Sequence, residues 1–258
     1  MIAGPALGGI LIASVGLRLT FCVDLMSYLL SLFCFRMIPS LPATDSAQRP
    51  GLSSIAEGFR YARSRQELMG SYIVDFIAMI FGMPLALFPA ISDHLGGPKT
   101  LGLLYAAPAM GTLVASILSR WNSRVHRHGL GIMIAASVWG VAIIVFGFTT
   151  TLVPAVVCLA IAGGADGFSA MYRMTLWNQT IPDSLRGRLA GIEMVSYMSG
   201  PLLGNAEAGL VAAPFGVKAS VVSGGVLCVI GVLLCGLLLP KFVQYNALTF
   251  ASEREKVQ

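Results

Sequence analysis

The stretch "AGPALGG" at residues 3–9 returns in nearly the same form as "SGPLLGN" at residues 199–205. After each copy come apolar residues, a glycine followed two positions later by a basic residue, and a second apolar run. The glycine and the basic residue are Gly16 and Arg18 after the first copy, and Gly216 and Lys218 after the second. Because motif, glycine, charge and following run all match, we expect an internal repeat. Each copy would be a pair of helices joined by a tight glycine turn.

Composition assigns the chain to the membrane proteins. Of its 258 residues, 56% are hydrophobic and 11% are charged, which is far less charge than a soluble domain needs to cover its surface. A helix of about 20 apolar residues crosses a bilayer core of about 30 Å. Eight apolar runs are long enough or nearly so, at 2–16, 19–38, 68–91, 101–119, 130–149, 152–175, 188–212 and 219–239. We therefore expect an all-α membrane protein with eight transmembrane helices.

The placement of the basic residues predicts the orientation of these helices. Thirteen lie at one set of span ends: Arg36, Arg49, Arg60, Arg63, Arg65, Arg120, Arg124, Arg127, Arg186, Arg188, Lys241, Arg254 and Lys256. Three lie at the other set: Arg18, Lys99 and Lys218. Cytoplasmic loops carry the excess of Lys and Arg, so the linker and the C-terminus are predicted to be cytoplasmic. The net charge of +5 then belongs to membrane topology, and no nucleic-acid partner is expected.

The repeat also predicts how the chain is organised. Many transporters consist of two repeated helix bundles with the substrate path between them. Residues 1–38 would be the last two spans of an N-terminal six-helix bundle, 39–67 a cytoplasmic linker, 68–239 a complete C-terminal six-helix bundle and 240–258 a cytoplasmic tail. Four further spans would then lie in a longer or a separate polypeptide, giving twelve in all. The alternative is a truncated remnant that does not transport.

The linker contains one segment with helical periodicity. "PSLPATDSAQRPG" at residues 39–51 breaks any helix, and "LSSIAEGFRYARSRQEL" follows it. Ser54 and Glu57 have the spacing of a capping box, and the apolar residues after them fall on one face. This predicts a short amphipathic helix. It would lie either on the inner membrane surface or packed against a neighbouring helix.

Several segments resemble the major facilitator superfamily. The Gly-Pro-rich spans are similar to the antiporter-type signature of that family, and the long linker falls where its two halves are joined. "ALFPAISD" (86–93), "GLLYAAPAMGTL" (102–113) and "WNQTIPDSLRGRLAGIE" (177–193) resemble the branch that contains the enterobactin exporter. The loop "SRWNSRVHRHG" (119–129) keeps the arginines of a family motif but lacks its acid.

The resemblance implies a secondary active transporter in the cell membrane. It would export a siderophore or another drug-like small molecule by alternating access, with protons as the coupling ion. The bilayer, the small molecule and the proton would then be its partners.

Charged residues inside the predicted spans are the candidate functional residues, because a charge in a bilayer is costly unless it is paired or hydrated. Asp75 lies among apolar neighbours and is a candidate proton-coupling residue, with a structural ion pair as the alternative. Asp166 lies near the predicted bilayer centre and is a candidate for the substrate path. Arg173 and Glu193 lie near the same ends of adjacent spans, where they are expected to pair or to handle substrate or protons.

Glycines and prolines in the repeated motif are candidates for helix packing or gating. They are Gly4, Pro5, Gly8, Gly200, Pro201 and Gly204. Glycine lets two helix backbones approach closely, and proline removes a backbone hydrogen bond. Pro84, Pro89 and Pro108 are expected to break the third and fourth spans.

The sequence holds no HExxH, GxSxG, Walker A or GxGxxG pattern in a fitting context, so no enzyme activity is expected. The five cysteines lie in apolar runs without a CxxC spacing, and the three histidines lie in predicted loops. Neither metal nor cofactor is therefore expected.

Overall fold

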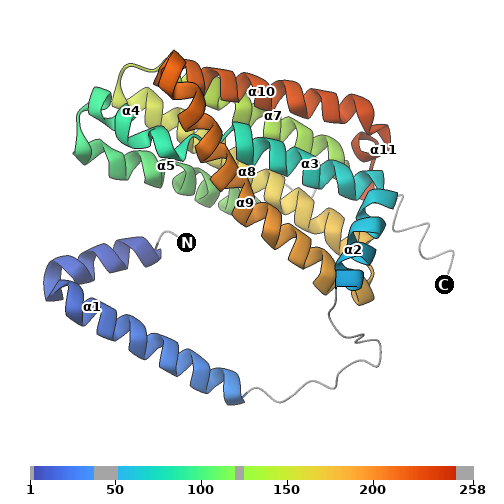
Figure 1. The fold of residues 1–258 in the computed structure, drawn as a ribbon, viewed down its shortest axis with the longest axis horizontal. Coiled ribbons are helices and arrows are strands. Elements are labelled where there is room, and N and C mark those ends of the chain that lie inside the picture. Colours follow the sequence, from blue (N-terminus) through green and yellow to red (C-terminus); the bar gives the residue numbers. More distant parts are fainter. Residues whose placement is uncertain (1–2, 38–51, 120–124, 248–258) are drawn as a thin grey trace. The chain divides into compact units, whose positions relative to one another are not determined.

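The computed structural model describes residues 3–37, 52–119 and 125–247, and every regular element in these ranges is a helix (Figure 1). The chain divides into two compact units, Met1–Pro50 and Gly51–Gln258. The segments 39–51 and 248–258, which belong to the predicted linker and tail, lie outside the described residues.

The described part of the first unit is a single helix, α1 (Ala3–Met37), which bends sharply in Figure 1. The predicted pair of spans with a turn at Gly16 is therefore wrong in one respect, since the helix runs through this position without interruption. No proline lies near Gly16, and Leu17, Arg18 and Leu19 are good helix formers. A lone glycine among such neighbours costs only about 1 kcal/mol and does not end a helix.

The second unit is a bundle of helices. Its elements are α2 (Leu52–Ser64), α3 (Gln66–Phe81), η1 (Leu85–Leu87), α4 (Phe88–Leu95), α5 (Pro98–Ile117), α7 (His128–Phe146), α8 (Leu152–Thr180), α9 (Asp183–Phe215), α10 (Val217–Leu238) and α11 (Pro240–Val243). Helix α8 packs against α5 on one side and α7 on the other, while α10 packs against α7, α3 and α9. The glycine turn predicted at Gly216 is present, with φ of 86° between α9 and α10.

Within the described part of the chain, six helical segments are long and apolar enough to cross a membrane: 18–37, 66–95, 99–117, 128–146, 152–180 and 217–238. The predicted count of eight is not confirmed. The run 2–16 is continuous with the rest of α1, and the run 188–212 lies within α9. Helix α9 has 33 residues, about 50 Å at 1.5 Å per residue, but Glu193, Asn205 and Glu207 make it more polar than the other six.

Close backbone contact joins α5 to α8. A Cβ on Gly111 would lie 1.8 Å from the carbonyl oxygen of Ala160, and one on Gly163 would lie 2.0 Å from that of Pro108. Only glycine fits at such distances, so these two helices are packed through their backbones. The hydroxyl of Thr112 adds a hydrogen bond of 2.9 Å to the carbonyl oxygen of Gly163.

The prolines break one span and leave another intact. Helix α3 ends at Phe81, with Gly82 as its C-cap. Pro84 precedes η1 and Pro89 occupies the first turn of α4, so the segment 66–95 is interrupted as expected. Trp139 of α7 donates a hydrogen bond of 2.7 Å to the carbonyl oxygen of Gly82 at this break. The expected break at Pro108 is wrong, since this residue lies inside α5.

The amphipathic helix of the linker is present as α2 and belongs to the second unit. It packs against α9, where Gly58 lies over the Cβ of Arg188 and Glu57 forms an ion pair with the guanidinium of Arg188. The Tyr61 hydroxyl donates a hydrogen bond of 2.8 Å to the carbonyl oxygen of Thr180. These contacts support the packed alternative, in which the helix rests on a neighbour.

Residues 240–247, which follow α10, pack against the ends of α3, α7 and α8. Phe242 is fully buried, and the space it fills is left free by Gly70 and Gly129. The Tyr245 hydroxyl donates a hydrogen bond of 2.8 Å to Gln179, and the Ala247 amide donates one of 2.9 Å to the carbonyl oxygen of His126.

Candidate functional site

The centre of the candidate site is a buried ion pair between α3 and α8. Asp75 lies nine residues after Gln66, about 13 Å along α3. Its carboxylate accepts a hydrogen bond from the guanidinium of Arg173 on α8. Each of the two side chains is only 10% exposed. A guanidinium stays charged at any physiological pH, so burial at this place requires a carboxylate beside it.

Asp166 extends this pair along α8. It lies at the midpoint of the helix, 14 residues from Leu152 and 14 from Thr180. One of its carboxylate oxygens is 3.9 Å from the second terminal nitrogen of Arg173, because residues seven apart share a helical face. The Asp166 side chain is 34% exposed, so it is more accessible than Asp75 and Arg173, which are each 10% exposed.

Glu193 brings a third carboxyl from α9. The side chain is half-buried, and Arg173 and Asp75 both lie close enough to act on it electrostatically. Within the described residues, however, no ion pair forms at Glu193. The expected pairing of Arg173 with Glu193 is therefore replaced by pairing with Asp75, on a helix that sequence proximity did not suggest.

Three further side chains hold α3 against α8 one turn from the ion pair, and the sequence did not single them out. The indole nitrogen of Trp177 donates a hydrogen bond of 2.9 Å to the Ser71 hydroxyl, which is fully buried. Tyr72 stacks on Trp177 with 5.1 Å between ring centroids. Serine, tyrosine and tryptophan are common in helix packing and do not stand out in the sequence. The one sequence feature that could have pointed to them is spacing, since Ser71 is four residues before Asp75 and Trp177 is four residues after Arg173.

The charges of the site do not balance when every group is ionised. Three carboxyls, those of Asp75, Asp166 and Glu193, surround the single guanidinium of Arg173. In a low-dielectric setting a net charge of this kind is costly, and two bound protons would remove it. The arrangement is therefore suited to the binding and release of protons. Among the described residues, no group of His, Cys, Asp and Glu side chains could hold a metal ion.

The glycines of the second repeated motif lie where α9 meets α3. A Cβ on Gly200 would be 2.8 Å from the Cβ of Met79, and one on Gly204 would be 2.6 Å from the carbonyl oxygen of Ile80. Pro201 lies within α9 between these two contacts, without ending the helix. Both glycines therefore pack α9 closely on α3, and their role in gating stays a prediction.

The corresponding residues of the first motif are Gly4, Pro5 and Gly8. They lie within α1, and their packing is outside what the structure describes. The loop residues Arg120 and Arg124 also lie outside the described residues.

Comparison with known proteins gives the family. The chain is 28% identical over 240 residues to "Enterobactin exporter EntS" of Citrobacter koseri, a match covering 92% of this chain and 58% of that protein. It is 27% identical over 241 residues to the proteins of the same name from Escherichia coli O1:K1 / APEC and Shigella boydii serotype 18, covering 90% of this chain and 56% of each.

The chain thus spans a little over half the length of the curated relatives it matches. No solved structure matches it significantly. The family model described as "Major Facilitator Superfamily" matches two overlapping stretches, residues 1–204 and 76–255. The chain belongs to the Major Facilitator Superfamily.

Proposed function

We propose that this chain works in a secondary active transporter that exports a siderophore or a drug-like small molecule across the inner membrane by alternating access. The family match and the similarity to proteins named as enterobactin exporters support this class of function, and they favour a transporter over a non-transporting remnant. The six apolar helices support a multi-pass membrane protein. The linker and the C-terminus would face the cytoplasm, as the charge distribution predicts.

The single observation that carries the coupling proposal is the shared arginine. Arg173 contacts the carboxylate of Asp75 and lies 3.9 Å from that of Asp166. Asp166 is more exposed than Asp75, and we expect it to take up the proton. Once Asp166 is neutral, Arg173 interacts with one carboxylate instead of two, and that carboxylate is Asp75. Protonation would then change how strongly α3 is held to α8. In this proposal Asp166 exchanges the proton, Arg173 and Asp75 respond to it, and Glu193 adds the third acid from α9.

The test measures proton coupling apart from substrate binding. The protein, as its cell makes it, is reconstituted into proteoliposomes with enterobactin as the probe. One assay follows transport driven by a pH gradient, and a second follows exchange of labelled for unlabelled substrate without a gradient. We expect Asp166→Asn to lower gradient-driven transport at least 10-fold, about 1.4 kcal/mol or more, while exchange continues.

Glu207→Gln is the matched control, since Glu207 is a partly buried acid of α9 outside the site. It should leave both assays near the wild-type level. Wild-type gradient dependence in Asp166→Asn would refute the coupling role of this residue. If the wild-type protein moves no substrate in either assay, the non-transporting alternative takes the place of the transporter.

A further inference from the structure

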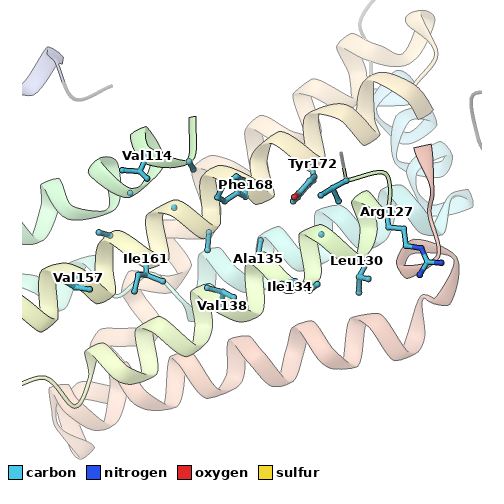
Figure 2. A pocket seen from close by; sticks show the side chains of 17 residues that line it. Val114, Arg127, Leu130, Ile134, Ala135, Val138, Val157, Ile161, Phe168 and Tyr172 are labelled. Carbon is cyan, nitrogen blue, oxygen red and sulfur yellow. The ribbon is translucent and has the colours of Figure 1, made fainter. Parts of the chain in front are cut away.

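A long apolar groove runs along the surface between α5, α7 and α8 (Figure 2). Its volume is about 670 Å³. The floor consists of small residues, among them Gly111, Ala135 and Gly164, and the walls are larger aliphatic side chains such as Ile134 and Ile161. The groove is separate from the charged site described above. Its lining does not include Asp75, Asp166, Arg173 or Glu193.

Among the described residues that line this groove, one is charged. Arg127 lies at one end, beside Leu130, whereas Val157 and Ile161 lie at the opposite end (Figure 2). Arg127 is exposed, and among the described residues it has no ion-pair partner. The Tyr172 ring forms part of the wall between the two ends. A ligand that fits would be apolar along its length and anionic at one end.

The length of the groove corresponds to one leaflet of a bilayer. Arg127 and Val138 are 11 residues apart in sequence, about 16 Å along α7, and Tyr172 and Val157 are 15 apart, about 22 Å along α8. Half of a bilayer, headgroup region included, measures roughly 20–22 Å. The groove therefore extends from the headgroup level at Arg127 to about the bilayer centre.

A second apolar groove runs along the exposed face of α7 and is also lined by Cys158 and Ile161 of α8. It holds about 510 Å³, reaches Leu233 of α10, and shares Leu130, Ile134, Val138 and Ile161 with the first. Arg127 lines the first groove, Leu130 lines both, and both grooves follow α7. This layout fits a molecule with one anionic head and two apolar chains.

We propose that these two adjoining grooves bind one anionic phospholipid of the Arg-rich leaflet, with its phosphate at Arg127 and one acyl chain in each groove along α7. That leaflet is the cytoplasmic one if the predicted topology holds. A cation near the membrane surface attracts anionic lipid, and the aliphatic walls supply the burial that holds the chains. The site is separate from the proposed coupling site and does not depend on it.

The test uses the purified chain in detergent, titrated with phosphatidylglycerol or phosphatidylcholine and followed by native mass spectrometry. We expect at least one phosphatidylglycerol to be retained in preference to phosphatidylcholine. Arg127→Gln should weaken that binding about fivefold, the effect of losing one cation at an anionic surface. The matched charge control is Arg186→Gln, because Arg186 is exposed and pairs only with Asp183 at 3.1 Å within the described residues. This variant should bind lipid as the wild type does.

A steric pair of variants tests the grooves themselves. Ile134→Trp places a large ring in the wall that both grooves share and should remove the preferred lipid, whereas Leu237→Trp, on an exposed position of α10 outside the grooves, should not. Equal retention of the two lipids, or unchanged binding in Arg127→Gln, overturns the proposal. Displacement of phosphatidylglycerol by enterobactin would also overturn it, since the grooves would then belong to the substrate path.

Discussion

Separating Asp75 from Arg173 should destabilise the bundle far more than removing an exposed ion pair. Both side chains of the buried pair are 10% exposed. Removing one partner of such a pair leaves a buried charge uncompensated and costs about 3–5 kcal/mol. Asp75→Asn leaves Asp166 at 3.9 Å from the same guanidinium, so we expect the lower end of this range, about 3 kcal/mol.

The control is the pair between Glu57 and Arg188, in which the Glu57 side chain is 54% exposed. Exposed pairs contribute about 0–1 kcal/mol, so Glu57→Gln should change stability little. For chains of this size each kcal/mol lowers the melting temperature by about 2–4 °C. The expected loss for Asp75→Asn is therefore about 6–12 °C, against a few degrees for the control.

The assay follows thermal unfolding through the reaction of a maleimide dye with Cys158, Cys228 and Cys235, which are buried in the folded protein. The double variant Asp75→Leu with Arg173→Met removes both charges of the buried pair. The remaining acids, Asp166 and Glu193, are only partly buried and can be hydrated or protonated, so this variant should recover most of the stability that Asp75→Asn loses. Two results would refute this reasoning. One is an equal loss in Asp75→Asn and Glu57→Gln, and the other is a double variant less stable than the single one.

Two further predictions concern packing and pH. Gly111→Ala should destabilise the bundle by more than 2 kcal/mol in thermal unfolding, because its Cβ would lie 1.8 Å from the carbonyl oxygen of Ala160, whereas Gly102→Ala meets no atom within 4 Å and should be neutral or stabilising. Burial raises the pKa of Tyr245 to about 12, so the stability that its neutral phenol contributes is complete below pH 10 and is lost as pH rises from about 10 to about 12. Melting temperatures from pH 8 to 11 should fall more steeply in the wild type than in Tyr245→Phe, and parallel curves would contradict the assignment.

The two copies of the repeat show how far a local pattern predicts structure. The motif and the glycine are nearly the same in both, yet the chain turns at Gly216 and remains helical at Gly16. Pro214 lies two residues before Gly216, and no proline precedes Gly16 within the same distance. Glycine permits a positive φ without requiring it, and the residues around it decide whether the helix stops.

The apolar runs were sufficient to locate most of the long helices. Six of the eight expected spans agree with helices of the right length and hydropathy, because burial in a bilayer imposes a long apolar run that is visible in any sequence. Helix breaks were harder to predict. Pro84 coincides with one, while Pro108 lies inside α5.

The cost of a charge in a bilayer identified the site residues from the sequence, but it could not predict which of them form an ion pair. The cost of a charge in a bilayer applies to each residue separately, so it singled out Asp75, Asp166, Arg173 and Glu193 from sequence alone. Which acid meets Arg173 depends on the rotation of α3 about its axis, and that is set by contacts 98 to 106 residues apart, such as the bond from Trp177 to Ser71. Such contacts involve ordinary side chains with no periodic signal. Since the bond and the ion pair lie on the same faces of α3 and α8, the packing that fixes this rotation also selects Asp75 as the partner.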